Sequence, residues 1–134
     1  NPLDIARNLT DQTGIEKRRA NRIARTEVTT ALRRAKWDED QEANDLFGLK
    51  TLLVHISALS PTTRHTHAVR HAHLYTNEEV RDWYGKDGNS INCKCSQQSV
   101  LVDEDGNPEY PDTITKLKQE YKSMQARGYA WAEK

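Results

Sequence analysis

Histidines and cysteines gather in one stretch of this 134-residue chain. Four of its five histidines fall within nine residues, from His65 to His73, and its two cysteines, Cys93 and Cys95, follow about twenty residues later. Imidazole nitrogens and thiolate sulfurs are the ligands that Zn²⁺ prefers. The grouping constrains the fold more than any other feature, because it predicts that the histidine segment and the cysteine segment lie against each other.

The predicted metal ligands are His67, His71, Cys93 and Cys95. On a helix, His67 and His71 would share one face, which is the arrangement that two imidazoles need to bind one ion. On an extended segment, the two cysteines would point to the same side. Such a set would surround a structural zinc ion tetrahedrally and leave no open position. The alternative is that the histidines cap turns and the cysteines are partly buried small residues without a metal.

A disulfide between Cys93 and Cys95 would close a very tight, strained ring. The two thiols are therefore expected to be free or to bind a metal, which suits a reducing compartment. His65 and His73 fall off the helix face of the predicted ligands, and both are expected to be exposed.

The rest of the chain predicts an α+β fold, in which a long N-terminal amphipathic helix packs on a small sheet, with short helices and a C-terminal helix. With 35% apolar and 30% charged residues, we expect one domain with a small core, spanning residues 1–134. The main part of this domain would be residues 15–103, and residues 104–134 would add a turn and a C-terminal helix. A helix is expected at 3–10, with a break at 11–14. A long helix is expected to start from a capping box formed by Thr13 and Glu16 and to run to about 47. Further helices are expected at 78–84 and 112–127, strands at 50–58 and 95–102, and one or two helical turns within 62–71.

The long helix is indicated by the absence of Pro and Gly before Gly48, which is placed to end it. Apolar residues recur every three or four positions and predict one buried stripe through Ala20, Ile23, Ala24, Val28, Ala31, Leu32 and Ala35. Glu27 falls on this stripe, and a buried carboxylate needs a partner. We expect Glu27 to accept hydrogen bonds from the histidine loop, for example from Arg64; a catalytic role for Glu27 is the alternative.

Two local patterns place the other elements. Alternation in 50–58 puts Leu53, His55 and Ser57 on one face of a strand that is apolar enough to be central in its sheet. Thr76 followed by Glu79 predicts a capping box at the start of the helix that Gly85 ends.

The charges balance, with 20 basic and 20 acidic residues, so no overall field drives the chain to nucleic acid. Their distribution is uneven, because eight basic residues and one acid lie between Lys17 and Lys36. This region is either a solvated helix face or a face that binds the phosphates of DNA. No apolar run is long enough to span a membrane. The sequence starts without Met or a signal-peptide pattern, so we expect a piece of a longer chain that no signal peptide secretes.

A catalytic interpretation also exists. His71 and His73, with a downstream asparagine at 89 or 92, faintly resemble metal-dependent nucleases of the ββα-metal type, which need a general-base histidine beside a phosphate-binding metal. Carboxylates are scarce near these histidines in the sequence. A small metal-dependent nuclease or hydrolase, such as a prophage-borne effector, is therefore the alternative function.

Several short motifs occur in an order that resembles the C-terminal domain of the Mu F-like minor head proteins of tailed bacteriophages. The resemblance covers roughly residues 15–103 and departs from the family pattern at Ser60, where an Asp is usual, and at Ala72, where a Gly is frequent. The matching motifs are Arg25-Thr26-Glu27, Thr63-Arg64 with His67 and His71, and Asn92-Cys93-Lys94-Cys95.

The resemblance implies phage virion morphogenesis. It predicts a minor capsid component that associates with the portal and capsid proteins during head assembly and is not an enzyme. Its place would be the virion head or the host cytoplasm during assembly. The basic face of residues 17–36 would suit contact with DNA or with an acidic portal surface.

Overall fold

The computed structural model describes residues 1–13 and 16–133, without the side chains of residues 9–13 and 133. Its mixture of helices and an antiparallel sheet confirms the predicted α+β class. The elements in chain order are α1 (Pro2–Thr13), α2 (Lys17–Phe47), β1 (Thr51–Ile56), α3 (His65–Ala68), β2 (Leu74–Tyr75), α4 (Asn77–Tyr84), β3 (Ser96–Leu101), α5 (Asp112–Gln125) and the 3-10 helix η1 (Ala130–Glu133).

The sheet has the order β2-β1-β3, and both pairings are antiparallel. β1 is central, as its pattern predicted. The register pairs His55 with Gln97 and Leu53 with Ser99, so these four side chains share one face of the sheet. The two-residue strand β2 was not predicted, because so short a strand carries no alternation pattern.

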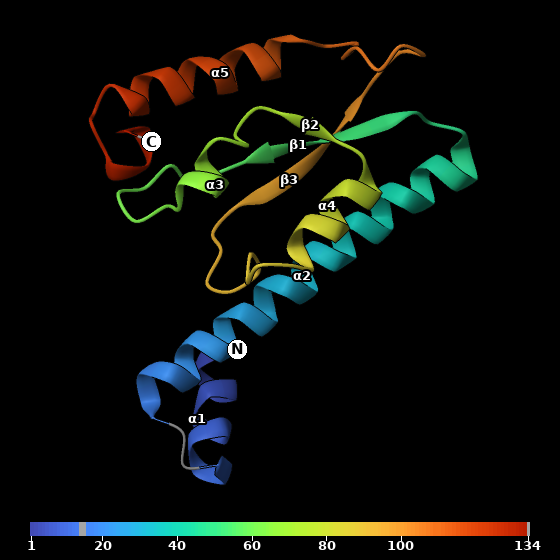
Figure 1. The fold of residues 1–134 in the computed structure, drawn as a ribbon. Helices are drawn as coiled ribbons and strands as arrows, with labels where there is room; N and C mark the ends of the chain where they lie inside the picture. Colours follow the sequence, from blue (N-terminus) through green and yellow to red (C-terminus); the bar gives the residue numbers. More distant parts are fainter. Residues whose placement is uncertain (14–15, 134) are drawn as a thin grey trace.

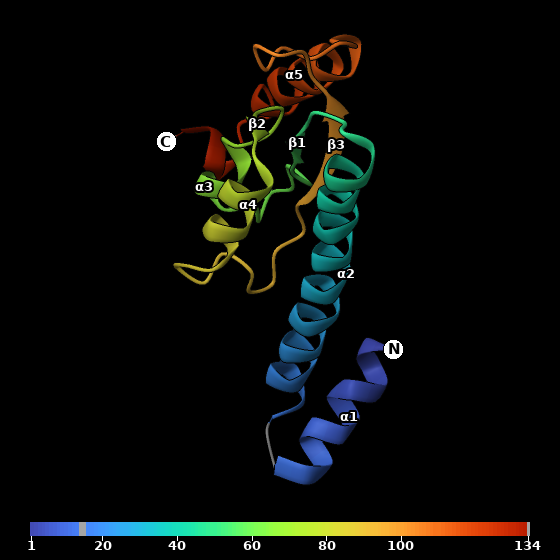
Figure 2. The ribbon, with the colours of Figure 1, turned by 90° about the vertical axis from the view of Figure 1, so that its right-hand side faces the viewer.

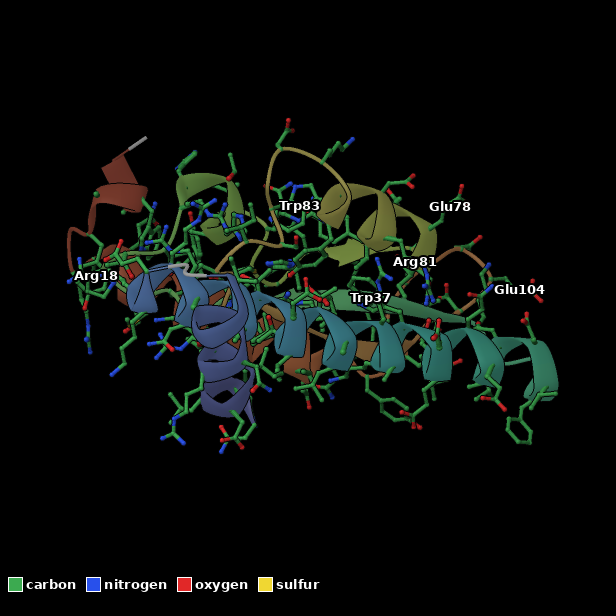
Figure 3. All side chains as sticks on the ribbon, turned by 90° about the horizontal axis from the view of Figure 1, so that it is seen from below. Arg18, Trp37, Glu78, Arg81, Trp83 and Glu104 are labelled. Carbon is green, nitrogen blue, oxygen red and sulfur yellow. The ribbon has the colours of Figure 1, made fainter. Side chains whose placement is uncertain are left out.

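Helices cover both faces of the sheet. Figure 1 shows α2 and α4 on one side and α5 on the other. The main apolar cluster lies on the α2 side and contains Trp37, Leu53, Val80, Tyr84, Cys93 and Cys95. Arg81 of α4 reaches toward α2 and Trp37 in Figure 3. Its guanidinium bonds the Asp38 carboxylate at 2.8 Å and lies 5.6 Å from the ring centre of Trp37.

The N-terminal half of α2 extends away from the sheet together with α1 (Figures 1 and 2). Between these two helices, Ala6, Ala20 and Ala24 are buried. Their small side chains allow the helices to approach closely, as the small residues of the predicted stripe indicated. We call this pair, residues 2–13 and 17–28, the helical arm.

Element ends follow local signals. Gly48 has a φ of 64°, a left-handed conformation that glycine adopts without strain, and its N–H bonds the carbonyl of Asn44. The predicted capping box is confirmed, with Thr76 and Glu79 each bonding the backbone N–H of the other. α1 continues to Thr13, so the break expected at 11–14 is wrong for 11–13, and residue 14 lies outside the described residues. α2 begins at Lys17 with Glu16 as its N-cap and without a side-chain cap hydrogen bond, so the capping box expected from Thr13 is wrong.

The predicted apolar stripe of α2 is wrong beyond residue 28. Leu32 is 67% exposed, whereas Arg33, Trp37 and Asp40 are buried. These buried polar groups are tolerated because they are hydrogen-bonded. Asp40 accepts bonds from three side chains, those of Thr51, Asn77 and Ser99.

Candidate metal centre

Three of the four predicted ligands converge. Nδ1 of His67 lies 3.4 Å from Sγ of Cys93 and 3.7 Å from Sγ of Cys95, and all three side chains are buried. Their ligand atoms lie within 4.8 Å of one another. In a tetrahedral zinc site with ordinary bond lengths, neighbouring ligand atoms are about 3.6 Å apart. The donor types and the two nitrogen–sulfur distances therefore both fit a zinc ion.

The two cysteines lie on the segment that leads into β3. The N–H of Cys95 donates to Sγ of Cys93 at 3.3 Å, which turns both sulfurs to the same side. His67 comes from the short helix α3, and its ring packs against Trp83 with 4.7 Å between ring centres. The site thus joins α3 to the start of β3, as the clustering in the sequence predicted.

Arg33 fixes the backbone of both cysteines from α2. Its Nη2 donates to the carbonyls of Cys93 at 2.8 Å and Cys95 at 3.1 Å, and its Nε donates to Cys95 at 3.2 Å. Charge-assisted hydrogen bonds of this kind are among the stronger ones in proteins. This role of Arg33 is not apparent from the sequence, where Arg33 is one of eight basic residues between Lys17 and Lys36.

A buried chain of hydrogen bonds ends on Cys93. The indole N–H of Trp37 donates to Gln97 at 3.0 Å, and Nε2 of Gln97 donates to the hydroxyl of Tyr84 at 3.0 Å. The Tyr84 hydroxyl in turn lies 3.5 Å from Sγ of Cys93. A thiolate at Cys93 would accept a hydrogen bond from that hydroxyl, so the network favours the deprotonated form of Cys93, which is the form that binds a metal.

The two thiols influence each other's ionisation. The hydrogen bond with Cys95, followed by those with His67 and Tyr84, lowers the pKa of Cys93. The same contact with Cys93, together with burial, raises the pKa of Cys95. The pair therefore carries one thiolate readily, and a bound cation would stabilise the second.

His71, the fourth predicted ligand, does not join this group. α3 ends at Ala68, so the helical spacing that was to bring His71 beside His67 does not exist. Nδ1 of His71 instead accepts the N–H of Ser57 at 3.0 Å, and its Nε2 lies 3.8 Å from a carboxylate oxygen of Glu120. Burial lowers the pKa of His71, and Glu120 partly offsets this effect.

The other histidines have separate environments. His73 is exposed, as expected, but His65 is half-buried, with Nδ1 2.7 Å from the carbonyl of Trp131, so its expected exposure is wrong. His55 is buried on the face that the alternation of 50–58 predicted, 3.5 Å from Nε2 of Gln97. Burial lowers the pKa of His55 to about 3, which keeps the ring neutral.

Residues of the phage-protein motifs brace the loop before Cys93. Thr26 of α2 accepts the N–H of Asn92 at 3.0 Å, while Asn92 holds a φ of 50° that asparagine tolerates better than most residues. Arg64 donates to the carbonyls of this loop, at Gly88, Asn89 and Ile91.

The other motif residues do not touch the cysteines. Thr63 binds the backbone N–H of Ser60 at 2.9 Å, and Arg25 and Glu27 are exposed on α2. The prediction that Glu27 would bond the histidine loop is wrong. Thr26 and Arg33 make the contacts from α2, because the helix turns those side chains toward the cysteine segment.

A cavity of about 100 Å³ borders all three ligands. Its remaining walls are polar or small and come from both the histidine segment and the cysteine segment. They are formed by Ala58, Ser60, Thr62, Thr63, Arg64, Asn92 and Lys94.

The fold and the site define an α+β protein with a buried candidate centre for a soft metal. Residues 1–98 match the family described as Phage Mu protein F like protein, and the chain belongs to this family. The match includes both cysteines and ends within β3. The curated proteins and the solved structures each contain no match to the chain. Among the described helices, none is both long enough and apolar enough to cross a membrane.

Proposed function

We propose that the protein acts in phage head morphogenesis, as a minor capsid component that contacts the portal and capsid proteins and has no catalytic activity. The observation that carries this proposal is the family match over residues 1–98. In this proposal it acts in the host cytoplasm during assembly and then in the virion head. The buried polar contacts around Cys93 serve to hold one element against another, which suits a structural role.

We propose the helical arm and the α2 residues beyond it as the contact surface for these partners. Of the eight basic residues between Lys17 and Lys36, seven are exposed and only Arg33 is buried. A group of exposed cations suits an acidic portal surface or the phosphates of packaged DNA. The arm extends away from the sheet (Figure 2), so a partner can reach it from several sides.

The test uses phage in which the gene is deleted and then complemented. Without the protein, we expect few DNA-filled heads by electron microscopy, and wild-type protein should restore them. A variant with Arg18, Arg19 and Arg22 changed to Gln should not restore them and should lose co-purification with the portal. The control changes Lys116, Lys118 and Lys122 of α5 to Gln. Normal heads without the protein would contradict the proposal.

We also propose that His67, Cys93 and Cys95 bind zinc, which clips α3 to the start of β3. Zinc would supply folding free energy that the small core lacks. Purified protein should contain one zinc per chain, and His67→Ala and Cys93→Ser should both lose it and lower the melting temperature. His73→Ala, which changes an exposed histidine, is the matched control. Metal-free protein with unchanged melting in both variants would contradict this proposal.

The alternative function is a small metal-dependent nuclease or hydrolase. One observation favours it, because three protein ligands beside a cavity are typical of catalytic rather than structural zinc sites. The same walls carry hydroxyls, an amide and cations, and no wall residue in the described part of the chain is a carboxylate that could act as general base. Zinc-dependent cleavage of DNA or RNA that disappears in Cys93→Ser would favour the nuclease over the structural role.

A further inference from the structure

We propose that the metal at this centre keeps its fourth position open toward the neighbouring cavity, where it holds a water molecule that small anions displace. This inference rests on the zinc proposed for His67, Cys93 and Cys95. It reverses the expectation of a closed site, which depended on His71 as the fourth ligand.

The ligand geometry leaves one position free. Within the described residues, His67, Cys93 and Cys95 are the group of possible ligands whose atoms lie within 4.8 Å of one another. Tetrahedral coordination needs a fourth donor. The two buried histidines outside the group have no ring nitrogen within 4.8 Å of all three ligand atoms. Nδ1 of His71 bonds the backbone of Ser57, and Nδ1 of His55 faces Gln97.

The fourth position faces the cavity rather than the core. Trp83 packs against the ring of His67, and the Tyr84 hydroxyl approaches Cys93, so protein groups occupy part of the space around the ligands. The cavity of about 100 Å³ touches all three ligands, and this volume is enough for several waters or one small anion.

The charged residues around the cavity favour an anion over a cation as the ligand at the fourth position. Zinc with two thiolates and a neutral imidazole has no net charge, so the surroundings decide the sign of the ligand. Arg64 and Lys94 both line the cavity. The Arg64 guanidinium is held in place by three carbonyls of the loop 88–91, so its charge is fixed next to the loop that leads to Cys93. Hydroxyls of Ser60 and Thr62 on the same walls can donate to a bound anion.

The test replaces zinc with Co²⁺, whose visible absorption bands report the coordination of the metal, and uses azide as the anion. Titration with azide should shift these bands and saturate at one azide per cobalt, while the cobalt stays on the protein through gel filtration. Lys94→Gln should weaken azide binding roughly two- to five-fold, as expected for loss of one exposed charge. Lys86→Gln changes an exposed lysine outside the cavity and should bind azide like the wild type.

Three outcomes would overturn the inference. Cobalt that binds with bands insensitive to azide would mean that the protein fills the fourth position; zinc binding would then stand and the open position would be wrong. A shift that accompanies loss of cobalt from the protein would show extraction of the metal rather than binding of the anion. Protein that binds neither zinc nor cobalt would contradict both the zinc centre and its open position. None of these outcomes bears on head morphogenesis.

Discussion

The histidine segment 65–73 is held from two sides that differ in chemistry. On the cysteine side, His67 meets two thiols in a buried polar network that α2 and α4 complete. On the C-terminal side, His65 and His71 meet η1 and α5, where they contact a backbone carbonyl and a carboxylate. Three histidines within seven positions, His65, His67 and His71, thus have different roles. The element that each imidazole faces decides its role.

The two sides also differ in packing. Trp131 is only 2% exposed on the C-terminal side, where it packs with Leu59 and Ala68 and donates its indole N–H to the carbonyl of Ser60 at 3.1 Å. Packing around one large indole therefore holds this side, whereas the cysteine side combines the main apolar cluster with a buried network of polar groups. The family match ends at residue 98, so the whole cysteine side lies inside it, and α5 and η1 lie beyond it.

The largest expected effect separates the two sides. Trp131→Ala should lower the free energy of unfolding by about 3–5 kcal/mol, because it removes a large buried side chain and leaves a cavity. Urea denaturation measures the loss, and zinc content should remain one per chain. Tyr110→Ala, at a position that is 73% exposed, is the control. Loss of zinc in Trp131→Ala would show that the two sides are coupled.

The next effect tests the cysteine side. Arg33→Met should cost about 3 kcal/mol, because two buried carbonyls lose their charged donor. The variant should also bind zinc more weakly, since the backbone of Cys93 and Cys95 is no longer fixed. Arg34→Met alters an exposed neighbour and should stay within about 0.5 kcal/mol of the wild type. Equal behaviour of the two variants in denaturation and zinc titration would refute this role of Arg33.

A pH series examines the polar network. The folded state keeps His55 neutral, with a pKa of about 3, while the unfolded chain titrates near 6.5. Below pH 6.5 the unfolded state therefore binds one more proton, so stability is full above that pH and falls as the pH drops. From pH 6.5 to 5.0 this should cost about 2 kcal/mol.

The measurement compares wild-type protein with His55→Gln by urea denaturation at each pH, under the same zinc concentration. The variant should be less stable at pH 7.5. Between pH 6.5 and 5.0 its free energy of unfolding should fall less steeply with pH, by the slope that corresponds to about one bound proton. The difference between the two slopes isolates His55 from the titration of the zinc ligands. Identical slopes would mean that His55 is not the titrating group.

The smallest effect concerns the loop before Cys93. Thr26→Val removes the acceptor for the N–H of Asn92 and should cost about 1 kcal/mol. Glu27→Gln, at the neighbouring exposed position, should change stability by less than about 0.5 kcal/mol. The reverse order in thermal denaturation would restore the bracing role that the sequence predicted for Glu27.

Local signals in the sequence determined much of the fold. Gly48, the Thr76–Glu79 capping box and the alternation of 50–58 each depend on residues within a few positions of one another, so their effects were predictable. The order of the short motifs also identified the family, and the density of histidines and cysteines located the candidate metal centre.

Tertiary structure decided which residues make the site. The early end of α3 removed His71 from the ligand set, and contacts about 60 residues apart along the chain placed Arg33 on the cysteine carbonyls. An apolar stripe predicts a buried face only where the facing element is also apolar. The sequence of α2 cannot show that the segments facing it offer two carbonyls to Arg33, the side chain of Gln97 to Trp37, and three side-chain donors to Asp40. These partners are why Arg33, Trp37 and Asp40 are buried in place of Leu32.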